Sequence, residues 1–372
     1  MHRNILFFTV FIFSLTFINT PTAYAHEMWL LSVTEVVTLN ALSIPTAFMF
    51  DNPISLLVMT IMSLLFLVAY YGEIYFKDIE NQYADKIMPL VTHYIPVIMR
   101  LSLGLVLLYA AFGILPRHGN SAGTPTLFVP DLMLKILGDW GNIFAYAQII
   151  IAAMLLLGVY VRIAASGIIV LVVMGSAAFG ADMMVSYAAH FMMPALFLLC
   201  VGSGQILNLP DNITSTISPK MQKISDFFAS CDMDIIYRTI LFGTGFNFLF
   251  LGVYFKFMQP NLIIGILSSS AFPLFGLPVE YVALIMACIE VFAGLCLMMG
   301  ILVRPISALL LFAMTLFSVI LGENPIMHGN LYGLMILCFV YGSVKYDTDE
   351  VFDLKQRVLN HRVLKPRHHH YA

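Results

Sequence analysis

Charge is scarce in this chain: Asp, Glu, Lys and Arg make up 10% of its 372 residues, whereas hydrophobic residues make up 60%. The sequence has no basic patch typical of nucleic-acid binding, no P-loop and no Rossmann glycine fingerprint. Its five cysteines include no C-x2-C pair, the usual dithiol of thiol–disulfide catalysis. These absences argue against nucleotide, nucleic-acid and thiol–disulfide chemistry. A soluble domain cannot hide so much apolar surface, so the long apolar runs predict transmembrane helices.

The N-terminus has the three parts of a secretory signal peptide. Arg3 precedes an apolar run over residues 5–17, and the small-x-small triplet at 23–25 follows. We expect cleavage after Ala25, so that residues 1–25 are removed and His26 becomes the first residue; the alternative is an uncleaved anchor. A terminal His offers an amine and an imidazole, which makes His26 a weak candidate ligand for copper.

The remaining apolar runs predict an all-α, polytopic membrane protein with nine transmembrane helices. We place these helices at about residues 54–71, 96–115, 142–161, 163–181, 184–203, 238–256, 279–302, 305–321 and 327–344. Each can cross an apolar layer of about 30 Å at 1.5 Å per residue.

The basic residues predict the orientation of these helices. Of the 18 Lys and Arg residues, fourteen fall on the side of the C-terminus, three on the opposite side and one in the signal. The positive-inside rule then predicts a membrane protein with its mature N-terminus outside the cytoplasm and its C-terminus in the cytoplasm. Its first expected partner is therefore the lipid bilayer.

The membrane part contains an internal repeat, because similar motifs recur in the same order at nearly one offset. Gln148-x9-Gly158-x3-Arg162 is matched 142 residues later by Glu290-x9-Gly300-x3-Arg304. At offsets of 138 and 139, three further features match: Arg100 with Arg238, Gly113-x3-Arg117 with Gly252-x3-Lys256, and His190-x9-Cys200 with His328-x9-Cys338.

The repeat predicts two parallel four-helix units preceded by one N-terminal transmembrane helix. We divide the chain into the signal (1–25), an N-terminal segment with the first helix (26–95), the first unit (96–203), a cytoplasmic linker (204–236), the second unit (237–344) and a basic tail (345–372). An even number of crossings per unit gives both units one orientation, which differs from the inverted repeats of many transporters.

These motifs resemble the DoxX-like integral membrane proteins. The second unit is the better match, with Glu290-x9-Gly300-x3-Arg304 as its core, whereas the first has Gln148 in place of Glu290 and Arg117 in place of Lys256. That family includes subunits of a thiosulfate:quinone oxidoreductase and small membrane partners of redox enzymes. The resemblance therefore implies a tandem DoxX-like protein that works with a membrane or periplasmic redox partner.

Glu290 is the first candidate for chemistry, because it lies near the middle of its helix, where a carboxyl group must be protonated, paired or hydrated. Glu290 could transfer a proton to or from a quinone or small substrate; the structural alternative is a protonated Glu290 bonded to Asn247. His190 and His328 could bond a quinone, ligate haem or a metal, or simply bond a loop carbonyl.

Lys256 and Arg117 are expected to close the outer end of each unit's first helix. They could bind an anion or a quinone head-group, or extend to the lipid headgroups as interfacial basic residues commonly do. Arg100, Arg162, Arg238 and Arg304 are interpreted as topology anchors on the cytoplasmic side.

Three functions stay open at this stage. The first is a quinone-linked redox component of a bacterial inner membrane, in the periplasm-facing orientation given above and with no covalent cofactor of its own. Its pocket for a quinone or a small substrate would lie near Glu290, Asn247, Gln148, His190 and His328. The second is a non-enzymatic scaffold or accessory subunit that docks a partner through two long outer connections, residues 116–141 and 257–278. The third is a small-solute carrier.

Overall fold

The computed structural model describes residues 33–41, 52–114, 123–204, 227–228, 230–270, 272–274, 276–321 and 324–343. The predicted signal, His26, Arg117, most of the linker and the basic tail lie outside these residues. The described part is all-helical and contains no strand, apart from one isolated bridge between Thr126 and Met133.

Seven helices are long and apolar enough to cross a membrane, and the all-α prediction is confirmed for the described residues. These spans are Pro53–Tyr75, Thr92–Ala111, Asp139–Leu157, Val161–Phe179, Met233–Phe257, Val279–Met299 and Val303–Ile320. The other two predicted helices are present as shorter apolar stretches, Val185–Val201 and Pro325–Tyr341.

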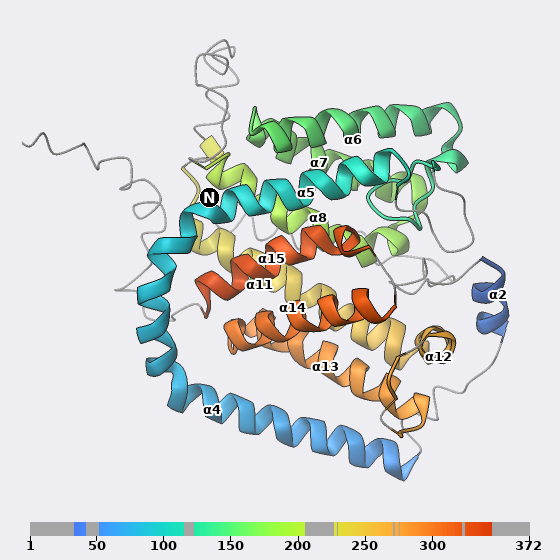
Figure 1. The fold of residues 1–372 in the computed structure, drawn as a ribbon, viewed down its shortest axis with the longest axis vertical. Helices are drawn as coiled ribbons and strands as arrows, with labels where there is room; N and C mark the ends of the chain where they lie inside the picture. The colour runs from blue at the N-terminus through green and yellow to red at the C-terminus, as the bar shows by residue number, and fades with distance from the viewer. Residues whose placement is uncertain are drawn as a thin grey trace, which may run out of the picture.

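The bundle is built from helices of 13 to 21 residues, apart from the longer α4. They are α5 (Ile95–Ala111), α6 (Asp139–Leu157), α7 (Val161–Phe179), α8 (Ala181–Val201), α11 (Met233–Phe250), α13 (Val279–Met299), α14 (Val303–Ile320) and α15 (Gly329–Tyr341). A π-helical turn, η4 (Leu251–Phe257), extends α11, and the 3-10 turn η5 (Pro325–His328) precedes α15. Two short helices, α2 (Val33–Ala41) and α12 (Pro260–Ser269), pack together beside the bundle (Figure 1).

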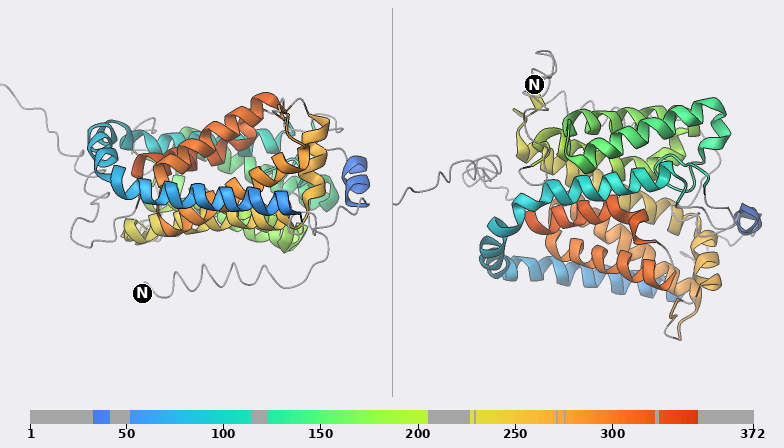
Figure 2. Two further views of the ribbon diagram at one scale, coloured as in Figure 1. Left: turned by 90° about the horizontal axis from the view of Figure 1, so that it is seen from below. Right: turned by 45° about the horizontal axis from the view of Figure 1, so that its top comes forward.

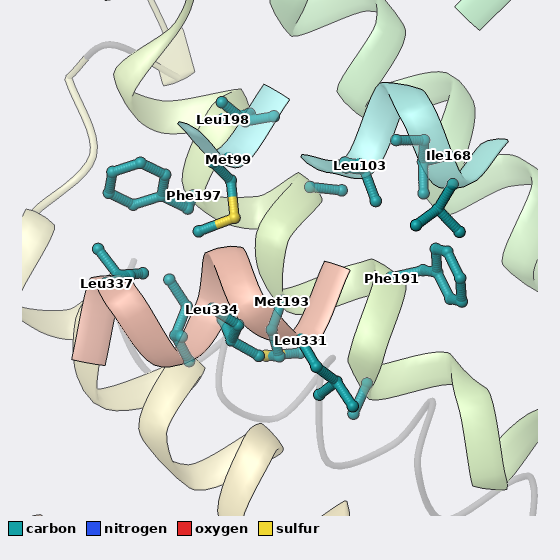
Figure 3. Close-up of a cluster of buried hydrophobic side chains, with 14 of the residues drawn as sticks. Met99, Leu103, Ile168, Phe191, Met193, Phe197, Leu198, Leu331, Leu334 and Leu337 are labelled. Atoms are coloured by element: carbon teal, nitrogen blue, oxygen red, sulfur yellow. The ribbon is translucent and has the colours of Figure 1, made fainter. Parts of the chain in front are cut away.

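The helices pair in a regular way. Neighbours in sequence pack as α5 with α6, α7 with α8, α11 with α13 and α14 with α15. Between these pairs, α8 packs against α11, α15 packs against α5, and α8 also contacts α15. Apolar side chains from α5, α7, α8 and α15 fill the space between them, as Figure 3 shows for Met99, Leu103, Ile168, Phe191, Leu331 and Leu334.

Helix α4 (Pro53–Val91) is much longer than the predicted helix, which ended near residue 71. Its first part runs beside α13, and the helix then bends so that its second part crosses the ends of the other helices before α5 begins (Figures 1 and 2). The connection expected after residue 71 is therefore helical.

Glu73 fastens α4 to the helices that come last in the sequence. One carboxylate oxygen accepts a hydrogen bond from the backbone N–H of Leu302 at 2.6 Å, and the other accepts from the hydroxyl of Ser343 at 2.9 Å. Leu302 immediately precedes α14, so the carboxylate also lies at the positive end of that helix dipole. Only 6% of the most apolar stretch of α4 is buried. The two hydrogen bonds of the buried Glu73 carboxylate are therefore an important attachment of this helix to the bundle.

The two Gly-x3-Arg motifs form tight turns with similar backbone geometry. Gly158 and Gly300 have φ of 71° and 68°, and two residues later Tyr160 and Leu302 have φ of 49° and 51°. Both glycines end a helix in the left-handed conformation, which a residue without a Cβ adopts at little cost. The arginine of each motif then opens the following helix.

Each arginine closes the hairpin that it begins. The Arg162 guanidinium donates to the carbonyls of Leu199 (3.1 Å) and Cys200 (3.2 Å) in the last turn of α8. Arg304 donates likewise to Phe339 (3.2 Å) and Tyr341 (3.3 Å) in the last turn of α15. These bonds satisfy carbonyls that have no partner within a helix and place positive charge at the negative end of its dipole. The predicted anchors therefore also cap helices.

Gly342 must leave room for this guanidinium. Its φ is +72°, and a Cβ there would come within 2.4 Å of Arg304 Cζ. We expect Gly342→Ala to lower the free energy of unfolding by roughly 2–4 kcal/mol, because left-handed strain adds to the displacement of Arg304. Gly276→Ala is the matched control, because Gly276 has φ of +78° with nothing within 4 Å of the added Cβ. Unfolding in mixed detergent measures both, and equal losses would show that the steric contact costs nothing.

Candidate functional site

Helices α11 and α13 approach each other through glycines. A Cβ on Gly245 would lie 2.5 Å from the carbonyl oxygen of Gly294, and one on Gly252 would lie 2.9 Å from the Val291 side chain. Small residues allow helix backbones to pack this closely in a membrane protein. The close packing also fixes the position of Lys256, which lies one turn beyond Gly252.

Lys256 and Glu290 form an ion pair between η4 and α13. Glu290 lies eleven residues after Val279, about 16 Å along the helix at 1.5 Å per residue, and therefore near mid-membrane. The Lys256 side chain is 8% exposed and the Glu290 side chain 19% exposed. Two charges in so apolar a place offset each other's desolvation cost only while they stay paired.

Lys256 lies in the last turn of η4, but its side chain is buried against Glu290 and does not extend to the headgroups. Gly252 lies against Ala287 and Val291, so Lys256 begins nearer the N-terminal end of α13 than Glu290 and reaches along the helix to it. The residues around Lys256 form a π-helix, whose wider turn changes side-chain directions and is frequent at functional sites. A partner carboxylate inside the bundle thus outweighs the attraction of the headgroup layer.

Asn247 does not bond Glu290, contrary to the structural alternative considered from the sequence. Its amide nitrogen donates to the carbonyls of Val185 (3.0 Å) and Ser186 (3.3 Å) on α8. The physical reason is that different faces of this helix contact different neighbours. Gly245 of α11 and Gly252 of η4 face α13, whereas Asn247 of α11 faces α8. Glu290 and Asn247, two of the five residues predicted to share a pocket, therefore lie at different helix interfaces.

Gln148 occupies the position in α6 that Glu290 occupies in α13, and it has a different task. Its side-chain oxygen accepts from the N–H of Phe128 at 2.9 Å, and its nitrogen donates to the carbonyl of Thr126 at 2.8 Å. Gln148 is fully buried, and both ends of its amide are thus used by the first outer connection. Gln148 therefore binds the backbone of this connection, a role that differs from the predicted contact with a substrate.

This connection folds into the bundle. Leu127, Phe128 and Leu132 are buried, and the Phe128 ring stacks on Phe191 of α8 at 4.5 Å. The hydroxyl of Tyr187 donates to the Asp131 carboxylate at 2.7 Å. The first of the two connections that were expected to dock a partner therefore places these apolar side chains against helices of its own chain.

His190 and His328 do not occupy equivalent positions, so their predicted match is wrong. His190 lies in the middle of α8, whereas His328 ends η5 before α15 begins. The glycines that cap α8 and α15, Gly202 and Gly342, are 140 residues apart, which differs from the offset of 138 that relates the histidines. When α8 and α15 are aligned by the glycines that cap them, the two histidines are therefore two residues out of register.

The Arg100 and Arg238 side chains also differ, although their sequence context suggested a pair. Arg100 in α5 is completely buried, whereas Arg238 in α11 is exposed. Burial of Arg100 does not fit the predicted role of a topology anchor at the membrane surface, because such a residue extends to the headgroups.

The carbonyl of His190 joins α8 to α15. Pro194 lies four residues later within α8 and has no N–H, so this carbonyl lacks its normal helical donor. The side-chain nitrogen of Asn330 donates to it at 3.1 Å. Asn330 is buried and therefore replaces a missing backbone bond across the helix interface.

This replacement predicts a strong coupling between Asn330 and Pro194. Asn330→Ala should lower the free energy of unfolding by about 1–3 kcal/mol, because it leaves a buried carbonyl unpaired. In a Pro194→Ala background the restored N–H should remove most of that loss. A double-mutant cycle in detergent measures the coupling, and additive effects would rule out the proposed replacement.

The described residues contain no group of three His, Cys, Asp or Glu side chains that could hold a metal ion. Their five cysteines are free thiols. The copper hypothesis for His26 lies outside the described residues.

With seven membrane-length helices and a buried ion pair, the chain has the construction of a polytopic α-helical membrane protein. No family model, curated protein or solved structure matches the chain.

Proposed function

We propose that this chain is a quinone-linked redox component of a bacterial inner membrane, and that Lys256 and Glu290 form its proton-exchanging site. The proposal includes two DoxX-like four-helix units, α5–α8 and α11–α15, with α4 as the additional helix. The similar Gly-x3-Arg turns and the corresponding helix pairs support the two units. The mature N-terminus is placed in the periplasm and the C-terminus in the cytoplasm on the basis of the basic residues.

The observation that carries the proposal is an ion pair near mid-membrane at a position where the first unit has an amide. Gln148 serves the structure as a neutral group, so the fold itself does not require a charge there. A buried ion pair also gives little net stability compared with apolar residues of similar size. Ionisable residues kept inside a membrane despite that cost commonly serve proton or substrate chemistry.

The pair suits a quinone because quinone reduction couples electrons to protons. Two electrons from a partner redox protein and two protons convert the quinone to the quinol. The Lys256 ammonium can donate a hydrogen bond to a quinone carbonyl oxygen and pass a proton to it, and the Glu290 carboxylate can take up a proton and return it to Lys256. The pair is neutral overall, so a neutral head-group can approach it without an uncompensated charge.

The test separates proton exchange from structural support. Glu290→Gln alone is unsuitable, since it leaves the Lys256 ammonium without its carboxylate. We therefore compare the double variant Lys256→Met/Glu290→Gln with the wild type and with Glu280→Gln, a carboxylate change in the first turn of the same helix. The measurements are the quinone retained after mild detergent extraction and the quinone reduction rate in membranes.

The double variant should fold but lose quinone reduction by about 10²–10⁴-fold, the usual range for a missing general acid or base. Glu280→Gln should leave the rate nearly unchanged. If the double variant keeps its quinone and its rate, the pair is structural, and an accessory role or solute transport becomes the better explanation. The burial of the first outer connection gives the accessory role less support than the sequence suggested.

A further inference from the structure

The interface between α8 and α11 contains buried polar atoms that have no hydrogen-bond partner among the described residues. Asn247 uses its amide nitrogen on the carbonyls of Val185 and Ser186, but its side-chain oxygen has no partner among the described residues. The hydroxyls of Ser186 and Thr244 likewise have none within that part of the chain. All three side chains are at most 2% exposed.

These three side chains belong to one helix interface. The bonds from Asn247 place its amide beside the backbone of Ser186. Thr244 precedes Asn247 by three residues and so shares its helix face. On the same interface, Gly243 lies against Met193, and the His190 ring is centred 6.2 Å from that of Phe248.

The hydroxyls of Ser186 and Thr244 do not make the hydrogen bond that Ser and Thr commonly make within a helix. Within helices such hydroxyls commonly donate to the carbonyl four residues earlier. Ser166, Ser176 and Thr239 do so here, at 2.8–3.0 Å. Ser186 and Thr244 do not, although the carbonyls of Asp182 and Ile240 precede them at that spacing. Their hydroxyls are therefore available to a common partner.

We propose that Ser186, Thr244 and Asn247 bind ordered water inside the membrane, between α8 and α11. Three dry, unpaired groups would together cost free energy comparable with the stability of a whole domain. One or two water molecules with two to four polar partners each remove that cost. The cluster supplies hydroxyls and an amide oxygen and no carboxylate, so it suits a neutral ligand better than a metal cation.

The water would join α8, the last helix of α5–α8, to α11, the first helix of α11–α15. His190 lies four residues after Ser186 on the same face of α8, so its ring borders the hydrated cluster. This inference rests on side-chain placement and burial and is independent of the proposed quinone chemistry. Its test accordingly needs no turnover assay.

The sign of a stability change distinguishes a hydrated cluster from a dry one. If water is bound, Thr244→Val and Ser186→Ala should each shift the folding equilibrium toward the unfolded state by about five- to tenfold, because the water loses a partner. If the cluster is dry, both changes remove an unpaired hydroxyl and should stabilise the protein instead. Thr239→Val is the matched control on α11, because the Thr239 hydroxyl already bonds Ile235.

Radiolytic hydroxyl labelling, which marks side chains beside bound water, gives a second readout that does not depend on refolding. Residues at the cluster, Met193 above all, should be labelled despite their burial, and Thr244→Val should reduce that labelling. The proposal fails if both variants are stabilised and Met193 stays unlabelled. It also fails if replacing sodium by choline destabilises the wild type but not Thr244→Val, since that result assigns the cluster to a cation.

Discussion

Replacing Lys256 by methionine is expected to destabilise the folded protein by about 3–5 kcal/mol, because the Glu290 carboxylate is then left in an apolar interior without its partner. Glu290→Gln should destabilise the protein by a similar amount, because it leaves the Lys256 ammonium without its partner carboxylate. The double variant Lys256→Met/Glu290→Gln should recover most of the loss, since neither charge remains. Unfolding in mixed detergent micelles gives the three free energies and their coupling.

Lys135→Met is the control for this cycle. Lys135 is an exposed lysine in the first outer connection, so its replacement should change stability by no more than about 0.5 kcal/mol. A Lys256→Met protein as stable as the wild type, or a coupling energy near zero, would show that the ion pair contributes nothing to the fold.

Replacing Gln148 by leucine is expected to free the first outer connection and to cost roughly 2–6 kcal/mol. The change leaves the N–H of Phe128 and the carbonyl of Thr126 unpaired, each at a cost of about 1–3 kcal/mol. Phe128 also has φ of +66°, a conformation that persists only while its surroundings hold it. Residues 124–133 should therefore exchange their amide hydrogens much faster than in the wild type.

Asn142→Leu provides the matched change, because Asn142 is an exposed amide on the same helix. It should leave hydrogen exchange in residues 124–133 unaltered. Unchanged exchange in Gln148→Leu as well would mean that buried apolar contacts alone hold the connection in place.

Several parts of this fold could be predicted from the sequence because one local cause determines each of them. Among the described residues, apolar runs of sufficient length predicted seven helices of membrane length and two shorter apolar ones, and the Gly-x3-Arg motifs mark two tight turns with similar geometry. The length of α4 was underestimated because its second part is polar, and polarity was taken as the end of a helix. A helix that turns along the end of the bundle needs no continuous apolar run.

The partners of the polar side chains could not be predicted, since they depend on which helix faces meet. Glu290 was correctly identified as a carboxyl in mid-helix, but its partner was expected on α11 at Asn247 and lies at Lys256, nine residues further on. The bond from Asn330 to His190 had a readable cause in Pro194, whose missing N–H frees a carbonyl. Glu73 gave no such signal, because its partners are 229 and 270 residues away.

The long sequence separation between Glu73 and its two partners limits when their hydrogen bonds can form during synthesis. A ribosome adding about 5–20 residues per second needs roughly ten seconds or more to reach Leu302 after it has passed Glu73. During that interval α4 is already available for insertion, while the turn and the hydroxyl that will receive its carboxylate do not yet exist. The first of the seven membrane-length helices described here is consequently among the last to be fixed in place, because the contacts of Glu73 can form only after Leu302 and Ser343 have been synthesised.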